Sequence, residues 1–252
     1  MKYVYILLFM LGCLSIQGQN STLFKEGNTL YNNGKYAEAI DKYMAILETG
    51  KHSSELYFNL ANAYYKLNNI APSIYYFEKA KLLNPSDEDI VNNLAYANNM
   101  TIDAIDVIPE VGFIKILKNI TNTFSFDTWA KIAVALAFLI VILILFYYFS
   151  FSSVKKRISF VTSTIGLLAL VMALAFAFHK FTLDKKDNPA IVFAQESQVK
   201  TEPNLRSEEA FRLHEGTKIQ VVDTVNSWKK IKLSNGKTGW VATEDIKMLK
   251  HK

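Results

Sequence analysis

The sequence predicts a multidomain protein in which all-α helical repeats come first, two transmembrane helices follow, and a small all-β barrel ends the chain. Three observations carry this prediction. A 34-residue period runs through residues 20–108, two uncharged apolar runs occupy residues 132–154 and 158–178, and polar and apolar residues alternate after residue 187. A period of about 34 residues is typical of stacked helix pairs, and alternation is typical of half-buried strands.

The composition bounds the function as well as the fold. The chain has 252 residues, of which 50% are hydrophobic, and a net charge of +5. Neither flank of the apolar runs is basic enough to predict nucleic-acid binding, so we expect no nucleic-acid partner. The single cysteine, Cys13, excludes an intramolecular disulfide and a zinc site made of several cysteines.

Residues 1–18 have the pattern of a signal peptide. A positively charged start precedes an apolar core, and a more polar end follows it, so we expect cleavage near Gly18. Leu11-Gly12-Cys13 also resembles the end of a lipoprotein signal, which leaves lipidation of Cys13 open. In either case the signal sends the residues from 21 onward across the inner membrane.

The 34-residue spacing recurs at several positions of residues 20–108. Small or apolar residues stand where the two helices of one unit must approach closely: Gly27, Ala61 and Ala95, Ala39 and Ser73, Tyr43 and Phe77, and Ile46 and Ala80. Asn33-Gly34 and Asn68-Asn69 are turn residues that separate paired helices. Asn84-Pro85-Ser86-Asp87 ends the second unit and predicts a cap for the next helix.

The second unit, residues 54–87, resembles the tetratricopeptide repeat. The resemblance is carried by Leu60-Ala61, Tyr64, Ser73, Phe77, Ala80 and Pro85. The unit at 20–53 shares part of the pattern, and a third unit keeps only its first helix. We expect that last helix to cap the array or to pack on the segment that follows.

The resemblance also implies a groove for a protein partner, because the fifth, ninth and twelfth positions of each first helix point inward. Those residues are Phe24, Asn28, Tyr31, Phe58, Asn62, Tyr65, Asn92, Tyr96 and Asn99. Aromatic and amide side chains favour an extended polypeptide over a metabolite. Lys66 is the candidate cation for a carboxylate clamp, and we expect an uncharged or mixed segment instead of a C-terminal carboxylate. The alternative is that the units share these residues only through common descent.

Each apolar run exceeds the roughly 20 residues that cross a bilayer as a helix, and we expect spans at 131–152 and 158–178. Lys155, Lys156 and Arg157 separate the runs. A cation at mid-bilayer costs about 2.5–3.5 kcal/mol, so a hairpin is favoured over one continuous helix. Short basic loops stay cytoplasmic, which predicts a bacterial inner-membrane protein with both terminal domains in the periplasm. The signal peptide predicts the same orientation.

Residues 109–130 connect the repeats to the first span. Within them Val111–Lys118 is amphipathic, so this segment either lies along the bilayer surface or packs as a helix under the repeats. Trp129 and Lys131 stand where interfacial anchors are expected. Small residues predict the faces through which the two spans pack: Ala133 and Ala137 in the first, and Ser159, Ser163, Ala169, Ala173 and Ala177 in the second.

Residues 187–250 are predicted to form the small barrel. Lys218-Ile219-Gln220-Val221 and Lys230-Ile231-Lys232-Leu233 alternate as half-buried strands do, and Asn235-Gly236 predicts a two-residue type I′ hairpin turn. Glu215-Gly216-Thr217, Trp228 and Gly236-Lys237-Thr238-Gly239-Trp240-Val241 resemble bacterial SH3 domains, which implies five to six strands. Trp228 and Trp240 are a candidate binding surface, or else they fill the core.

We find no catalytic constellation, because His52, His179, His214 and His251 stand at no ligand spacing and no nucleophile or phosphate-loop motif exists. A binding protein without a cofactor is therefore expected, and not an enzyme. The order of the parts resembles the BatE family of the Bacteroides aerotolerance system. That resemblance implies a scaffold for other Bat-type membrane proteins with von Willebrand A domains, encoded beside a MoxR-type ATPase. The alternative is a membrane protein that binds peptidoglycan.

Overall fold

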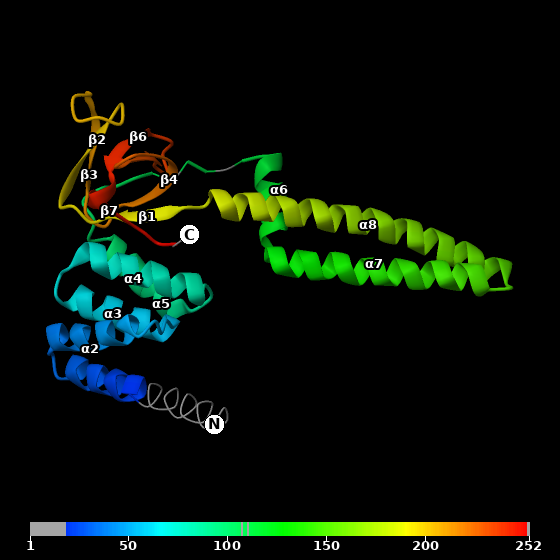
Figure 1. Cartoon of the computed structure of the whole chain (residues 1–252), viewed down its shortest axis with the longest axis horizontal. Coiled ribbons are helices and arrows are strands. Elements are labelled where there is room, and N and C mark those ends of the chain that lie inside the picture. The colour runs from blue at the N-terminus through cyan, green and yellow to red at the C-terminus, as the bar shows by residue number, and fades with distance from the viewer. Residues whose placement is uncertain (1–18, 107, 110, 251–252) are drawn as a thin grey trace, which may run out of the picture. The chain divides into compact units, whose positions relative to one another are not determined.

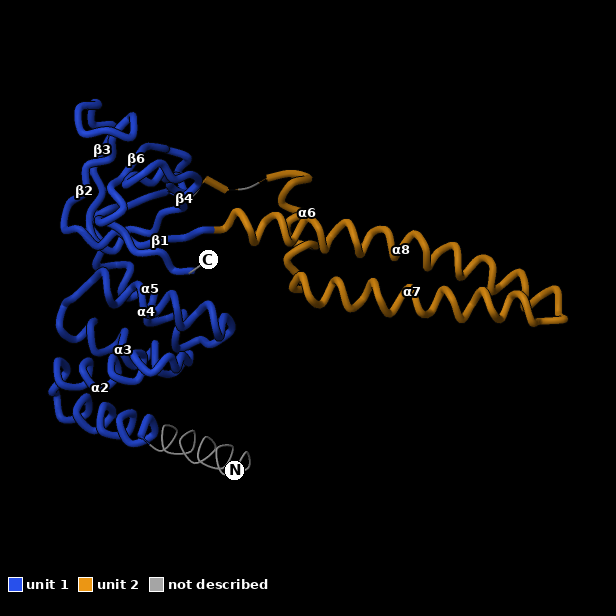
Figure 2. The backbone as a smooth tube through the Cα atoms, in the orientation of Figure 1, with its two compact units in different colours: residues 1–107, 188–252 blue, residues 108–187 orange. Residues whose placement is uncertain are grey.

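The computed structural model describes residues 19–106, 108–109 and 111–250 and divides into two units (Figures 1 and 2). Residues up to 107 and from 188 onward form unit 1, and residues 108–187 form unit 2. The predicted fold class is confirmed: helical repeats come first, two helices long and apolar enough to cross a membrane follow, and the chain ends in an antiparallel β region. The expected signal peptide, with Cys13, lies outside the described residues.

The repeat region is a stack of antiparallel helices. After a first helix, described over residues 19–32, come α2 (Tyr36–Glu48), α3 (Ser54–Lys66), α4 (Ile70–Leu83) and α5 (Glu88–Asn98). Ser53 and Asp87 cap α3 and α5, because their side chains accept hydrogen bonds from the first backbone amides. Gly34 and Asn68 turn the chain between paired helices with φ angles of 76° and 60°.

The small residues at the 34-residue spacing have the expected packing role in the two complete units. A Cβ atom on Gly27 would lie 2.5 Å from Cε1 of Tyr43, so only glycine lets these helices approach. In the second unit the Ser73 hydroxyl donates to the Ala61 carbonyl at 3.0 Å. Ala95, the equivalent residue of the third unit, is exposed, since residues 99–106 form turns and irregular structure instead of a second helix.

The β domain, residues 189–249, is one antiparallel sheet of seven strands in the order β3-β2-β6-β5-β4-β1-β7. The β domain therefore has more strands than the five to six that the resemblance implied. Ile219, Val221, Ile231 and Leu233 are buried, as the alternation predicts. The strands are β1 (Pro189–Val192), β2 (Glu196–Lys200), β3 (Glu209–His214), β4 (Lys218–Val225), β5 (Trp228–Lys232), β6 (Thr238–Ala242) and β7 (Ile246–Met248), with a 3₁₀ turn η1 (Thr243–Asp245) before the last.

The predicted turn chemistry of the β5–β6 hairpin was wrong in detail. Gly236 has a φ of 84°, but Asn235 does not share the positive φ that a type I′ turn requires. The Gly236 amide donates to the Leu233 carbonyl, so the loop is longer than two residues. A two-residue connection occurs instead between β4 and β5, where Val225 pairs with Trp228 and Asn226 has a φ of 50°.

The β domain packs directly on the repeat region within unit 1. Ile191 of β1 and Leu249 share one buried cluster with apolar side chains of α4 and α5, among them Ile74 and Leu94. The β domain thus supplies the apolar cover that a further repeat would supply. We call this contact the docking interface, formed by α4, α5 and residues 101–105 on one side and by β1, residues 214–218 and residues 248–249 on the other.

Polar bonds surround the apolar part of the docking interface. Lys218 Nζ lies 2.7 Å from Oε2 of the buried Glu78, and the Tyr75 hydroxyl donates to the Met248 carbonyl at 3.3 Å. The Asp103 carboxylate accepts from the His214 amide at 2.7 Å and from the Thr217 hydroxyl at 2.6 Å. It also pairs with Nδ1 of His214 at 2.8 Å, and since a carboxylate only accepts, that nitrogen carries the proton.

Unit 2 consists of α6 (Phe113–Asn122), α7 (Phe126–Phe149) and α8 (Ser153–Lys186). The link between α7 and α8 is only residues 150–152, so the basic triplet of residues 155–157 lies in the first two turns of α8 and not in the loop itself. The two helices pack through small residues, and a Cβ atom on Gly166 would already lie 3.2 Å from Ile140. The buried ones are Ala133, Ser159, Gly166, Ala173 and Ala177.

Candidate functional site

A cavity of about 520 Å³ lies on the side of the repeat region formed by the first helices of the units. Its lining is dominated by amide and aromatic side chains: Asn28, Tyr31, Asn32, Tyr43, Phe58, Asn59, Asn62, Asp89 and Asn93. Four of these are predicted groove residues, namely Asn28, Tyr31, Phe58 and Asn62. We call this cavity the groove.

Hydrogen bonds inside the groove hold Asn28 in a fixed orientation. Its Oδ1 accepts from the Tyr43 hydroxyl at 2.7 Å and from Asn59 Nδ2 at 3.0 Å. Burial, followed by the nearby Tyr31, raises the pKa of Tyr43 to about 12, so its hydroxyl stays protonated and donates at neutral pH. Asn62 is engaged only locally, through a bond from its Nδ2 to the Phe58 carbonyl. Asn28 therefore has a structural role, whereas Asn62 offers its carbonyl oxygen to a ligand.

The other five predicted groove residues lie elsewhere. Tyr65 packs against the buried cluster of α4 and α5, and Phe24 lines a different cavity. Asn92 and Tyr96 on α5, and Asn99 directly after it, are exposed and do not line the groove. In the third unit the groove is lined instead by Asp89 and Asn93.

Sequence reasoning missed five groove residues, and the 34-residue period could have found two of them. Asn59 and Asn93 are 34 residues apart, one position after the fifth position of their helices. Tyr43 does recur at the 34-residue spacing, with Phe77, but it stands on a second helix and was expected to pack between helices. Asn32 comes from a helix end and Asp89 from a first turn.

The charge of the groove is low. Asp89 is the one ionisable acid in its lining, and the lining contains no lysine or arginine. An adjoining cavity of about 380 Å³ shares Phe58, Asn59 and Asp89 and adds the acids Glu55 and Asp87. The Asp87 side chain already accepts hydrogen bonds from backbone amides as the N-cap of α5. The groove thus lacks the cations that would hold a ligand carboxylate.

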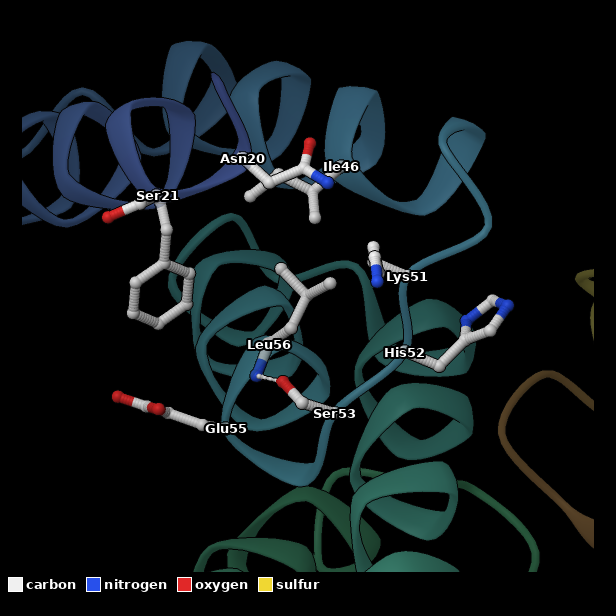
Figure 3. A pocket seen from close by; sticks show the side chains of 9 residues that line it. Asn20, Ser21, Ile46, Lys51, His52, Ser53, Glu55 and Leu56 are labelled. Atoms are coloured by element: carbon white, nitrogen blue, oxygen red, sulfur yellow. Dashed lines mark hydrogen bonds between the residues drawn. The ribbon is translucent and has the colours of Figure 1, made fainter. Parts of the chain in front are cut away.

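The cavity that contains Phe24 lies at the end of the first unit and measures about 320 Å³. Figure 3 shows Ile46 and Leu56 pointing toward one another across it, while His52 points away. Nδ1 of His52 lies 2.7 Å from the Tyr57 hydroxyl, which accounts for that orientation. Phe24 therefore belongs to the packing between the first helix, α2 and α3.

The outer face of the β domain carries a row of five residues across five strands. Register pairs join Glu209 to Lys200, Lys200 to Trp240, Trp240 to Lys230 and Lys230 to Asp223. Paired residues share one face of a sheet, so Trp240 stands between two lysines with an acid at each end. Lys230 Nζ lies 5.8 Å from the centre of the Trp240 ring. We call these residues the Trp240 row.

The two tryptophans proposed as a surface are both half-buried, and neither belongs to the buried core cluster of the β domain. Trp228 pairs with Ala242 and Val225, in the row beside that of Trp240. An aromatic ring flanked by cations fits a ligand with both apolar and carboxylate groups.

Known families match two parts of the chain. Residues 54–87 match the tetratricopeptide repeat, and residues 197–247 match the bacterial SH3 domain. The chain is 39% identical over 57 residues to the "Cell wall-binding protein YwsB" of Bacillus subtilis (strain 168), a match that covers 22% of this chain and 32% of that protein. The chain thus spans about a third of that curated relative. It is also similar to the solved structure "First TPR of Spaghetti (RPAP3) bound to HSP90 peptide SRMEEVD", with 28% identity, 33% of this chain and 66% of that chain covered, and a TM-score of 0.32.

Proposed function

We propose that this protein is a membrane-anchored adaptor that holds a protein partner in its repeat groove. The observation that carries the proposal is the groove itself: about 520 Å³, lined by aromatic rings and by five asparagines, with no cation. Aromatic rings give apolar contact area, and amides donate to and accept from a peptide backbone. The ligand is therefore an extended, uncharged or mixed segment. The match of residues 54–87 to a peptide-binding type of repeat supports this reading.

Crosslinking in cells, followed by recovery of the full chain, tests whether a partner binds in the groove. Asn62→Ala/Asn93→Ala removes two amides from the groove, and we expect the yield of crosslinked partner to fall about tenfold or more, because two hydrogen bonds to a buried ligand are lost. Asn33→Ala/Asn98→Ala is the matched control, since both asparagines are exposed outside the groove. Equal yields from both variants would exclude the groove as the binding site. The resemblance to BatE-type architecture names the expected partners, membrane proteins with von Willebrand A domains.

The proposed location is the bacterial inner membrane, with both ends of the chain on its periplasmic side. Residues 19–106 and 188–250 are joined by the docking interface, so they must lie on the same side of any bilayer that unit 2 enters. This requires that α7 and α8 both cross or that neither does. Within the uncharged runs at 132–154 and 158–178, most of the outward side chains are apolar, which favours crossing.

The orientation is measured with single cysteines in a Cys13→Ser background. Tyr96→Cys reports the repeat region, Val225→Cys reports the β domain, and Ser153→Cys reports the turn between α7 and α8. All three positions are exposed. In cells with a permeabilised outer membrane, an impermeant thiol reagent should label positions 96 and 225 but spare position 153. The reverse pattern contradicts the periplasmic orientation.

A second candidate function is binding of the cell wall through the β domain. Two observations favour it: the partial similarity to a protein whose name describes cell-wall binding, and the Trp240 row. Peptidoglycan stem peptides carry carboxylates that Lys200 and Lys230 could pair with, while the ring of Trp240 covers apolar groups.

Sedimentation of the purified full chain with peptidoglycan sacculi tests this candidate. Lys200→Gln/Lys230→Gln should reduce the bound fraction severalfold, because both cations of the row are lost. Lys25→Gln/Lys247→Gln makes the same change in net charge at exposed positions off the row. If the two variants sediment alike, any binding is nonspecific attraction to a basic protein.

A further inference from the structure

Helix α6 carries an exposed apolar stripe. Phe113, Ile116 and Ile120 are 75%, 56% and 43% exposed, and their spacing places them on one face of the helix. Lys115 lies on the opposite face, and the exposed Asn119 lies at the edge between the two faces. The division into an apolar and a polar face is the pattern of helices that lie in the plane of a membrane surface.

The end of α6 is fixed to both helices of the hairpin. Thr121 is fully buried, and its Oγ1 lies 3.0 Å from Nδ1 of His179 on α8. The Trp129 Nε1 of α7 donates to the Thr121 carbonyl at 3.0 Å. Lys180 Nζ donates to Asn122 Oδ1 at 3.1 Å. These bonds hold the C-terminal end of α6 against α7 and α8.

The sequences of α7 and α8 show where along the hairpin α6 is attached. The uncharged run of α7 begins directly after Lys131, and that of α8 ends directly before His179. The bonds to Trp129 and His179 therefore lie where the apolar surface of the hairpin stops. Tryptophan is enriched at that boundary of a bilayer. Exposed Phe124 and Phe126 continue the apolar surface between α6 and α7.

We propose that α6 is an interfacial lipid-binding helix. Phe113, Ile116 and Ile120 enter the acyl-chain boundary of the leaflet next to Trp129, and Lys115 faces the headgroups. This inference rests on the proposed insertion of α7 and α8. Its basis is the continuity of the α6 stripe with the hairpin surface and the three bonds that fix α6 at the hairpin's end.

Spin-label accessibility in lipid vesicles containing phosphatidylglycerol tests the proposal on the full chain. Single cysteines in a Cys13→Ser background are labelled at Ile116 and Ile120 on the apolar face, and at Lys115 on the polar face. Ile142→Cys within α7 gives the lipid reference, and Glu38→Cys gives the water reference. We expect oxygen to relax the labels at 116 and 120 as it does at 142, and a water-soluble nickel chelate to relax the label at 115 as it does at 38.

Two results would overturn the inference. Relaxation of positions 116 and 120 by the nickel chelate, at the level of position 38, would place the stripe in water. Shielding of both positions from both reagents would mean that protein covers the stripe. In either case, relaxation of the label at 142 by oxygen would still support the proposed insertion of α7. Relaxation of the label at 142 by the nickel chelate would contradict both that insertion and this inference.

Discussion

Gly216→Ala is expected to separate the β domain from the repeat region. A Cβ atom on Gly216 would lie 2.9 Å from each of three carbons on the repeat side: Ile70 Cγ2, Ile74 Cδ1 and Thr101 Cγ2. Glycine also has a φ of 85° there, which strains any side chain. Overpacking costs about 1–3 kcal/mol and the left-handed backbone about 1 kcal/mol, so we expect a loss of about 2–4 kcal/mol in the free energy of unfolding of unit 1.

Urea unfolding of the detergent-solubilised full chain measures this loss. Gly34→Ala is the matched control, because Gly34 has a φ of 76° but nothing within 4 Å of a built Cβ atom. Its expected cost is the backbone part alone, about 1 kcal/mol. If Gly216→Ala unfolds no more easily than Gly34→Ala, the docking interface contributes nothing at that glycine.

Asp103 is expected to make the docking interface sensitive to acid. Burial alone would raise the pKa of this carboxyl, but the bonds from the Thr217 hydroxyl and from the amide and ring of His214 outweigh burial and hold the pKa below its usual value. A carboxyl with a lowered folded pKa stabilises the fold above its unfolded pKa, about 3.9, and loses that contribution as pH falls through the folded pKa. We therefore expect unit 1 to keep this stability at neutral pH and to lose it below about pH 4.

Asp103→Asn isolates the contribution. At pH 7 we expect a loss of about 1–3 kcal/mol in the free energy of unfolding. The substitution removes the negative charge, and it replaces one accepting carboxylate oxygen by an NH₂ group that faces another hydrogen-bond donor. The difference from the unsubstituted protein should shrink as pH is lowered below 4. Asp106→Asn provides the control, since Asp106 is exposed three residues further on. A gap between the two variants that is constant from pH 7 to pH 3 would disprove the assignment.

The fold class could be predicted because each part has a periodic signal that local sequence carries. Gly27 and Ala61 mark close helix packing at a 34-residue spacing, and Ile219 and Ile231 mark buried positions of alternating strands. The uncharged runs indicate, by composition alone, two helices long and apolar enough to cross a membrane. Periodicity reports which face of an element is apolar, and that is sufficient for architecture.

The docking interface could not be predicted, since its key contacts join residues more than a hundred positions apart. Asp103 bonds to His214 and Thr217 across 111 and 114 residues. Asp103 has no distinctive neighbourhood in the sequence, and Glu215-Gly216-Thr217 indicated only a resemblance to bacterial SH3 domains, not a contact with the repeats. The candidate groove was only partly predicted: four of its nine lining residues were expected, and misses such as Phe24 and Tyr65 occur in the complete units as well as in the third.

The docking interface also determines when the protein can finish folding. The faces of α4 and α5 that hold Ile74 and Leu94 are made early, but Ile191 and Leu249, which cover them, are made after the hairpin. At about 5–20 residues per second, Leu249 follows Leu94 by roughly 10–30 s. Throughout that interval the repeats present uncovered apolar surface. A chain truncated before residue 189 is therefore expected to be more sensitive to proteases than the full chain, because nothing covers the apolar faces of α4 and α5.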